Sequence, residues 1–177
     1  MNPVYILVSF GAAAVSIVVA FGVWPRRTVP GGKALVLLLA ACAGWLLFSG
    51  FHELASELTT KILLSKIQSI GISVVPVAML VLCLLCTGYG NRVTQRFLIL
   101  IMAVPTATII MAWTNQLHYL YWSEVSWNLS SASTRVQYSH GPFFWIWSAY
   151  AYSLVLTGTI LFLRSLRGTA GVLRIQN

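Results

Sequence analysis

A polar, aromatic-rich stretch lies between two long apolar runs. It begins Trp113-Thr-Asn-Gln-Leu-His-Tyr-Leu-Tyr-Trp122 and ends Tyr138-Ser-His-Gly-Pro-Phe-Phe-Trp-Ile-Trp147. Two of the three histidines of the chain and one of its three acidic residues fall inside it. The runs on either side carry no charge, so the stretch is interpreted as a crossing between two membrane spans. Recognition of a ligand is expected there.

The composition places the whole chain in lipid. Of its residues 58% are hydrophobic and 8% charged, and the mean hydropathy is +0.83. A soluble domain carries about a quarter charged residues. The net charge of +8 comes from basic residues scattered between apolar runs. Such scatter indicates membrane topology rather than nucleic-acid binding, which needs a continuous basic patch.

Five apolar runs are long enough to cross a bilayer, which takes about 20 residues. They are residues 4–24, 34–59, 67–89, 97–114 and 143–163. The first is interpreted as a true span because it lacks the basic start of a signal peptide. The second is extended past the hydrocarbon to about residue 59, because Glu57 and Lys61 are four apart and can pair on a helix. The prediction is an all-α integral membrane protein, a five-helix transmembrane bundle forming one domain over residues 1–177.

Alternation in residues 134–138, after a serine-rich turn at 130–133, favours a short β-hairpin in the long loop between spans four and five.

Charge bias predicts the orientation of the bundle. The basic residues on one side of the predicted spans are Arg26, Arg27, Lys33, Arg92, Arg96, Arg164, Arg167 and Arg174. Those on the other side are Lys61, Lys66 and Arg135, together with the acids Glu53, Glu57 and Glu124. The positive-inside rule places the first group in the cytoplasm, which predicts an outside N-terminus, an inside C-terminus and an extracytoplasmic long loop in the cell membrane.

Polar and aromatic residues converge on the predicted outer face, where they could form a small-molecule pocket. The candidate ligand contacts are Glu53, Gln68, Trp113, Asn115, His118, Tyr138, His140, Trp145 and Tyr150. Three plainer readings stay open. The aromatics suit the membrane interface by themselves. Glu53 and Glu57 fit a solvated helix end, and Asn115 fits a helix C-terminal cap.

No metal, cofactor or catalytic function is expected from the motifs. Cys83-x-x-Cys86 lies in an apolar run without further zinc ligands, and both cysteines fit simple packing. A haem or metal site would need at least two of His52, His118 and His140 to converge, which their spacing does not require. The sequence has no nucleophile elbow, no His-Glu-x-x-His and no phosphate-binding glycine loop. Asn128-Leu129-Ser130 matches a glycosylation sequon of a length that arises often by chance.

Several short motifs follow in order along the chain. They are Glu53, Ile70-Gly71, Pro76 and Thr87-Gly88 in spans two and three, then Thr114-Asn115-Gln116-Leu117-His118 with Leu120 and Trp122, and finally His140-Gly141-Pro142-Phe143-Phe144-Trp145 with Tyr150 and Tyr152. In this combination the chain resembles the N-terminal seven-helix sensor region of prokaryotic histidine kinases. The similarity covers about residues 1–177.

The resemblance implies a membrane-embedded sensory module of a two-component system. A small molecule at the extracytoplasmic face would be sensed, and a homodimer or a cytoplasmic signalling module would be the partner. Members of the family continue into sixth and seventh spans and a kinase module, so a fragment or a short relative is expected, and no enzyme in the chain itself. Two alternatives stay open, a small transporter or scaffold subunit and a haem-binding membrane protein.

Overall fold

The computed structural model describes the backbone of residues 3–128 and 135–175, and the side chains of residues 3–127 and 136–166. Its helices are α1 (Pro3–Val23), α2 (Gly32–Leu54), α3 (Leu58–Cys86), α4 (Gln95–Trp113), the single turn α5 (Asn115–His118) and α6 (Pro142–Ile175). Short 3-10 turns η1 (Trp24–Arg26) and η2 (Gly90–Arg92) follow α1 and α3, and strands β1 (Trp122–Asn128) and β2 (Arg135–His140) precede α6. The predicted serine-rich turn and most of the glycosylation sequon lie outside the described residues.

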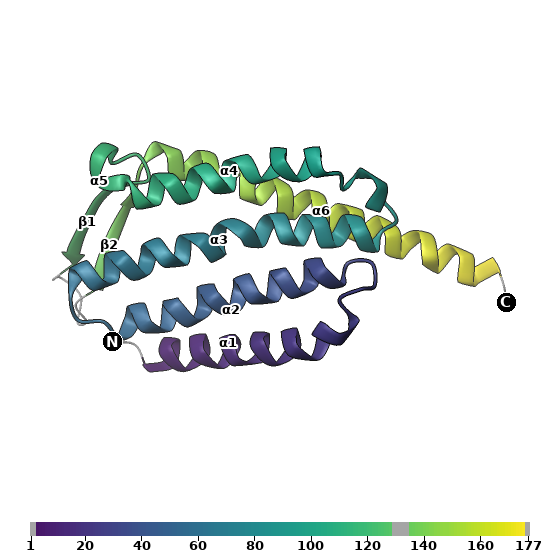
Figure 1. Cartoon of the computed structure of the whole chain (residues 1–177), viewed down its shortest axis with the longest axis horizontal. Coiled ribbons are helices and arrows are strands. Elements are labelled where there is room, and N and C mark those ends of the chain that lie inside the picture. Colours follow the sequence, from purple (N-terminus) through teal and green to yellow (C-terminus); the bar gives the residue numbers. More distant parts are fainter. Residues whose placement is uncertain (1–2, 129–134, 176–177) are drawn as a thin grey trace.

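The prediction of a five-helix membrane bundle is confirmed. Within the described residues, five helices are long and apolar enough to cross a bilayer: Pro3–Arg26, Gly32–Leu54, Leu58–Cys86, Gln95–Trp113 and Pro142–Leu166. A helix is the natural form for such runs, because it satisfies its own backbone hydrogen bonds where no water is present. In Figure 1 the helices α1, α2 and α3 lie side by side in chain order, and α4 and α6 lie beyond α3.

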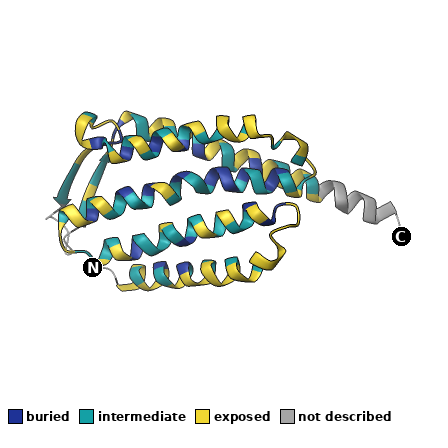
Figure 2. Cartoon of the chain, in the orientation of Figure 1, coloured by how far each residue is buried: buried dark blue, intermediate teal, exposed yellow. Residues whose placement is uncertain are grey.

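Helix α3 forms the centre of the bundle. It packs against α2, α4 and α6, whereas α1 packs against α2. Of its most apolar window 44% is buried inside the protein, against at most 22% for the other candidate spans. Figure 2 shows the buried residues concentrated along this helix. The outer helices expose their apolar side chains, as expected for surfaces that face lipid.

The predicted continuation of the second helix to residue 59 is wrong. Helix α2 ends at Leu54, because Ala55 has an extended backbone with φ −63° and ψ 140°. Glu57, also extended, then caps a third helix that begins at Leu58 rather than near residue 67. No ion pair joins the side chains of Lys61 and Glu57, both of which are described. The Nζ of Lys61 reaches back across the turn and donates to the carbonyl of His52, 2.6 Å away.

The predicted β-hairpin is confirmed. Strands β1 and β2 pair antiparallel, with Val125 opposite Tyr138 and Trp127 opposite Val136. The register shifts between Trp122 and Glu124, where Ser123 is the extra residue of a bulge. The hairpin crosses the end of the bundle at which α1 begins and α2 ends (Figure 1).

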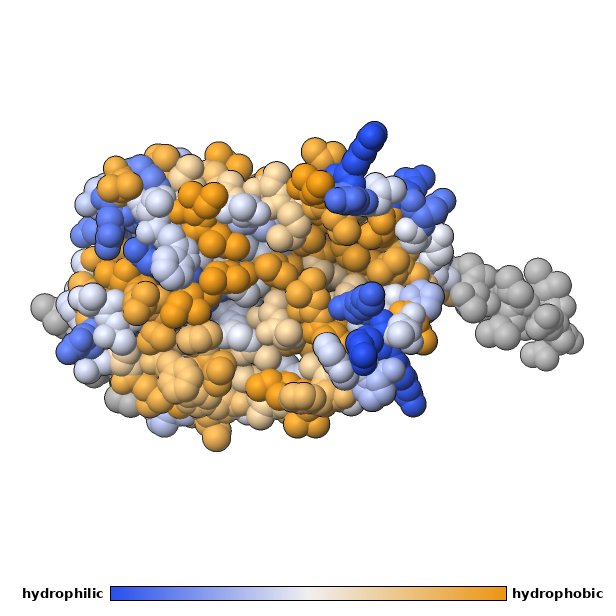
Figure 3. Space-filling view, in the orientation of Figure 1, coloured by the Kyte–Doolittle hydropathy of each residue, from blue (hydrophilic) through white to orange (hydrophobic). Residues whose placement is uncertain are grey.

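The two ends of the bundle are polar and the middle is apolar (Figure 3). The loops at the end opposite the hairpin contain basic residues held against aromatic rings. The Arg27 guanidinium lies 4.7 Å from the ring centroid of Trp24, and that of Arg92 lies 5.4 Å from Tyr89. Cation–π contacts at this level combine an interfacial aromatic ring with a charged group.

Candidate functional site

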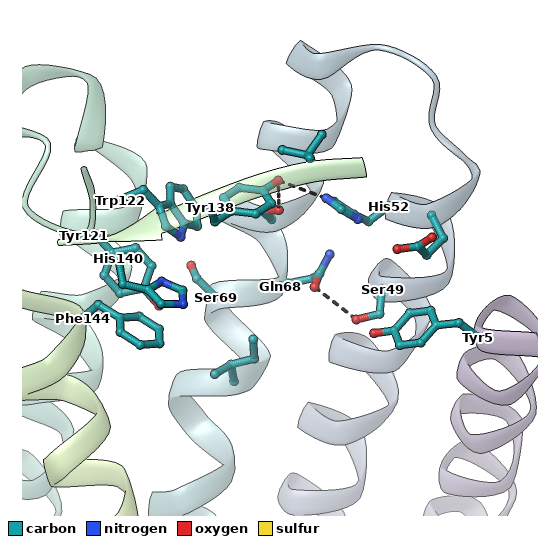
Figure 4. A pocket seen from close by; sticks show the side chains of 14 residues that line it. Tyr5, Ser49, His52, Gln68, Ser69, Tyr121, Trp122, Tyr138, His140 and Phe144 are labelled. Atoms are coloured by element: carbon teal, nitrogen blue, oxygen red, sulfur yellow. Dashed lines mark hydrogen bonds between the residues drawn. The ribbon is translucent and has the colours of Figure 1, made fainter. Parts of the chain in front are cut away.

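The main polar cavity of the described residues lies beneath the hairpin and measures about 340 Å³. Its walls come from the start of α1, the end of α2, the N-terminal half of α3, the hairpin and the start of α6 (Figure 4). Of the predicted site residues, those that line it are Glu53, Gln68, Tyr138 and His140. Side chains that are not among the predicted ligand contacts also line it, among them Tyr5, Ser49, His52, Ser65, Ser69, Tyr121, Trp122 and Phe144.

Gln68 joins the two helical walls of this cavity. Its Oε1 accepts a hydrogen bond from Ser49 at 3.1 Å, and its Nε2 donates to the carbonyl of Phe48 at 3.3 Å. Both partners belong to α2, so one side chain of α3 holds the neighbouring helix through two bonds. Glu53, half-buried one turn further along α2, is the acidic residue of the cavity lining.

Tyr138 latches the hairpin to these helices. Its hydroxyl lies 3.0 Å from Nε2 of His52 on α2 and 2.7 Å from Oγ of Ser65 on α3. A phenol donates one hydrogen bond and accepts others, so it can bond both partners at once. Burial raises the pKa of Tyr138, and the hydrogen bond with Ser65 partly offsets this rise. The phenol therefore stays protonated at physiological pH, so it keeps the proton that it donates to one of these two partners.

Aromatic rings close the opposite side of the cavity. Tyr121 packs edge-on against Trp122 and Phe144, with ring centroids 5.0 and 5.8 Å apart. The imidazole of His140 stacks on Phe144 at 3.7 Å with an interplanar angle of 6°. Burial raises the pKa of Tyr121 to about 12, so this hydroxyl also stays neutral. The cavity thus offers flat apolar faces on one side and hydrogen-bonding groups on the other.

Two buried lysines of α3 hold the two helices that flank α3, namely α2 and α4. Lys61 is 7% exposed and Lys66 9% exposed. Lys61 bonds the carbonyl of His52 in the last turn of α2, and Lys66 bonds the carbonyl of Trp113, the last residue of α4, at 3.1 Å. The last carbonyls of a helix have no partner within it and carry partial negative charge, so an ammonium group is a favourable partner.

Asn115 is the anchor of the hairpin, and its hydrogen-bonding atoms are already used. Its Oδ1 accepts from the backbone N–H groups of Tyr121 and Trp122, at 3.0 and 2.9 Å. Its Nδ2 donates to the carbonyl of Trp122 at 2.9 Å. The left-handed residue of this segment is Tyr119, with φ 56°, so the reading of Asn115 as a left-handed C-terminal cap is wrong.

His118 is similarly engaged within its own turn. Its Nδ1 accepts from the backbone N–H of Leu120 at 3.0 Å. Its Nε2 lies 3.1 Å from Oγ1 of Thr114, whose own proton goes to the carbonyl of Ile110. A neutral imidazole with its proton on Nε2 satisfies all of these contacts.

The other predicted residues lie outside the main cavity. Trp113 and Trp145 are 43% and 63% exposed, as membrane-interface aromatics often are. The edge of Trp145 contacts His140, with ring centroids 6.1 Å apart. Tyr150 donates to the carbonyl of Ile101 and so joins α6 to α4. As ligand contacts these residues, with Asn115 and His118, stay predictions.

A pattern in α3 pointed to some of the cavity residues that the prediction left out. Ser65, Gln68, Ser69 and Ile72 recur at intervals of three and four, which places them on one face of a helix. Three of them are polar within an otherwise apolar run. His52 directly precedes Glu53, which was a predicted ligand contact.

Metal ligands do not gather in the described part of the chain. No group of three or more His, Cys, Asp or Glu side chains there could hold a metal ion. His52 and His140 both line the main cavity, whereas both nitrogens of His118 are engaged elsewhere.

These features define a class of protein: a multi-pass membrane protein with a polar cavity at one end of its bundle. A family model described as the N-terminal 7TM region of histidine kinase matches residues 8–177. The chain therefore belongs to that family, and the resemblance expected from its motifs is confirmed. The family is an input region rather than a catalytic domain. Comparison with curated proteins and with solved structures gives no match.

We expect Tyr138→Phe to destabilise the protein by about 1–3 kcal/mol, because His52 and Ser65 lose a shared partner while partly buried. The melting temperature of the purified chain in detergent, followed by tryptophan fluorescence, measures this. Tyr152→Phe is the matched control, since Tyr152 is 75% exposed, and its effect should stay within about 0.5 kcal/mol. Equal melting temperatures for the two variants would show that the hydrogen bonds of Tyr138 to His52 and Ser65 do not stabilise the protein.

Proposed function

We propose that the chain is the sensory input region of a histidine-kinase receptor and that a small molecule binds in the cavity beneath the hairpin. The observation that carries this proposal is the cavity itself, about 340 Å³ in volume and lined by residues of α1, α2, α3, α6 and both strands of the hairpin. Pockets for small ligands usually measure about 300–1,000 Å³ and combine apolar walls with a few polar groups.

The ligand class follows from the lining. Tyr121, Trp122 and Phe144 favour a flat or apolar part of the molecule. Glu53 favours hydrogen-bond donors, and the amide of Gln68 and the serine hydroxyls can donate or accept. A small molecule with an amine or hydroxyl group and an aromatic or aliphatic body fits this arrangement.

The extracytoplasmic location of the cavity rests on the charge bias. Eight of the eleven basic residues fall on the side of the spans opposite the hairpin, and that side is assigned to the cytoplasm. Lys61 and Lys66, at the hairpin end, are buried against helix carbonyls. Their presence there therefore has a structural reason and does not weaken the bias.

Signal transfer would use α3. This helix has 29 residues and is about 43 Å long at 1.5 Å per residue, so it extends from the cavity to the opposite end of the bundle. A ligand that favours one arrangement of α2, α3 and the hairpin would shift the population of that arrangement. Pairing of two copies, which the resemblance implies, stays a prediction.

Orientation can be tested with single cysteines in a background in which Cys42, Cys83 and Cys86 are replaced by alanine. Ser123→Cys lies on the hairpin and Asn91→Cys in the loop of η2, and both positions are exposed. A membrane-impermeant maleimide should label Ser123→Cys in intact cells and Asn91→Cys only after permeabilisation. The reverse pattern would refute the assigned orientation.

Ligand binding can be tested on the chain in lipid nanodiscs with a library of amines, phenols and amino acids. Molecules that raise the melting temperature should bind Glu53→Gln and Gln68→Leu at least about tenfold more weakly, a loss of about 1.4 kcal/mol. Gln95→Leu is the matched control, because Gln95 is exposed at the opposite end of the bundle. Molecules that bind Gln68→Leu and Gln95→Leu with equal affinity would contradict the site.

A further inference from the structure

Lys66 has more hydrogen-bonding capacity than its described partners use. An ammonium group carries three N–H donors. One of them reaches the carbonyl of Trp113 at 3.1 Å, and no other partner of the Lys66 ammonium group is found among the described residues. The side chain is nevertheless only 9% exposed. Burial of a charge is costly unless opposite charge or further hydrogen bonds compensate it, so this site favours an additional anionic partner.

A second cavity, of about 190 Å³, lies beside this ammonium group. Ile62, Trp122 and Val125 give it apolar walls. Gln116, Tyr119 and Glu124 also line it, and because their side chains are exposed they mark its opening to the surface. Lys66 is buried among these residues and is therefore placed at the inner end.

The charges around this cavity select among anions. Glu124 lines the same cavity, yet no ion pair joins it to Lys66, although both side chains are described. The Glu124 carboxylate is thus a like charge for any entering anion, and it disfavours a dianion such as phosphate more than a monoanion. The apolar walls favour a ligand with a short hydrocarbon body.

We propose that the cavity beside Lys66 is a second binding site, for small organic monocarboxylates. The carboxylate bonds the free N–H groups of Lys66, and the hydrocarbon body packs on Trp122 and Val125. This site stands apart from the larger cavity and does not depend on the proposed function of that cavity. Trp122 lines both cavities, so an occupant of one contacts a wall of the other.

Butyrate is a suitable probe, with butyramide as its neutral counterpart. Titration of the whole chain in nanodiscs, followed by tryptophan fluorescence and by calorimetry, should show saturable binding of butyrate and at least about tenfold weaker binding of butyramide. Lys66→Met should weaken butyrate binding about tenfold or more. Lys33→Met is the control: it removes an exposed lysine at the opposite end of the bundle, which does not line this cavity, and butyrate affinity should be unchanged.

A second variant keeps the test decisive if Lys66→Met does not fold. Glu124→Gln removes an exposed like charge and should tighten butyrate binding about two- to fivefold. The proposal is overturned if wild type does not bind butyrate, if butyramide binds equally well, or if Lys66→Met binds like wild type. Unchanged affinity in Glu124→Gln overturns it too, as does tighter binding of inorganic phosphate than of butyrate.

Discussion

The end of the bundle that holds the cavity depends on how the last carbonyls of α2 and α4 are satisfied. These groups lie at the edge of a lipid phase, where an unbonded carbonyl is expensive. Lys61 and Lys66, five residues apart on α3, bond the carbonyls of His52 and Trp113. The central helix thereby fixes the ends of both neighbours. The hairpin is then held over them by Tyr138 and anchored by Asn115, which leaves a polar hollow underneath.

The spans were predictable because a bilayer requires about 20 apolar residues per crossing, and apolar runs of that length can be recognised in a sequence directly. The hairpin was predictable from alternation. The reversal at residues 55–57 was not, because Glu57 and Lys61 at a spacing of four fit a continuing helix as well as the first turn of a new one. Their actual relation depends on a contact across the turn, the bond from Lys61 to the carbonyl of His52 on α2. Local spacing contains no information about that contact.

The candidate site was predictable only in part, and for a related reason. Glu53, Gln68, Tyr138 and His140 do meet at one cavity, as their places at the ends of spans indicated. Asn115 and His118 stand in equally suggestive positions, but backbone groups and the Thr114 hydroxyl already occupy their polar atoms. A sequence shows which residue types are present. It does not show which of their donors and acceptors remain free.

The central claim is that a small molecule enters the cavity beneath the hairpin. Hydrogen–deuterium exchange of the chain in nanodiscs, with and without the most stabilising molecule of the library, tests it most directly. The account predicts slower exchange in residues 135–140 and around the turn between α2 and α3, with no change in residues 87–94 at the basic end. Protection confined to residues 87–94, with the hairpin unaffected, would contradict it.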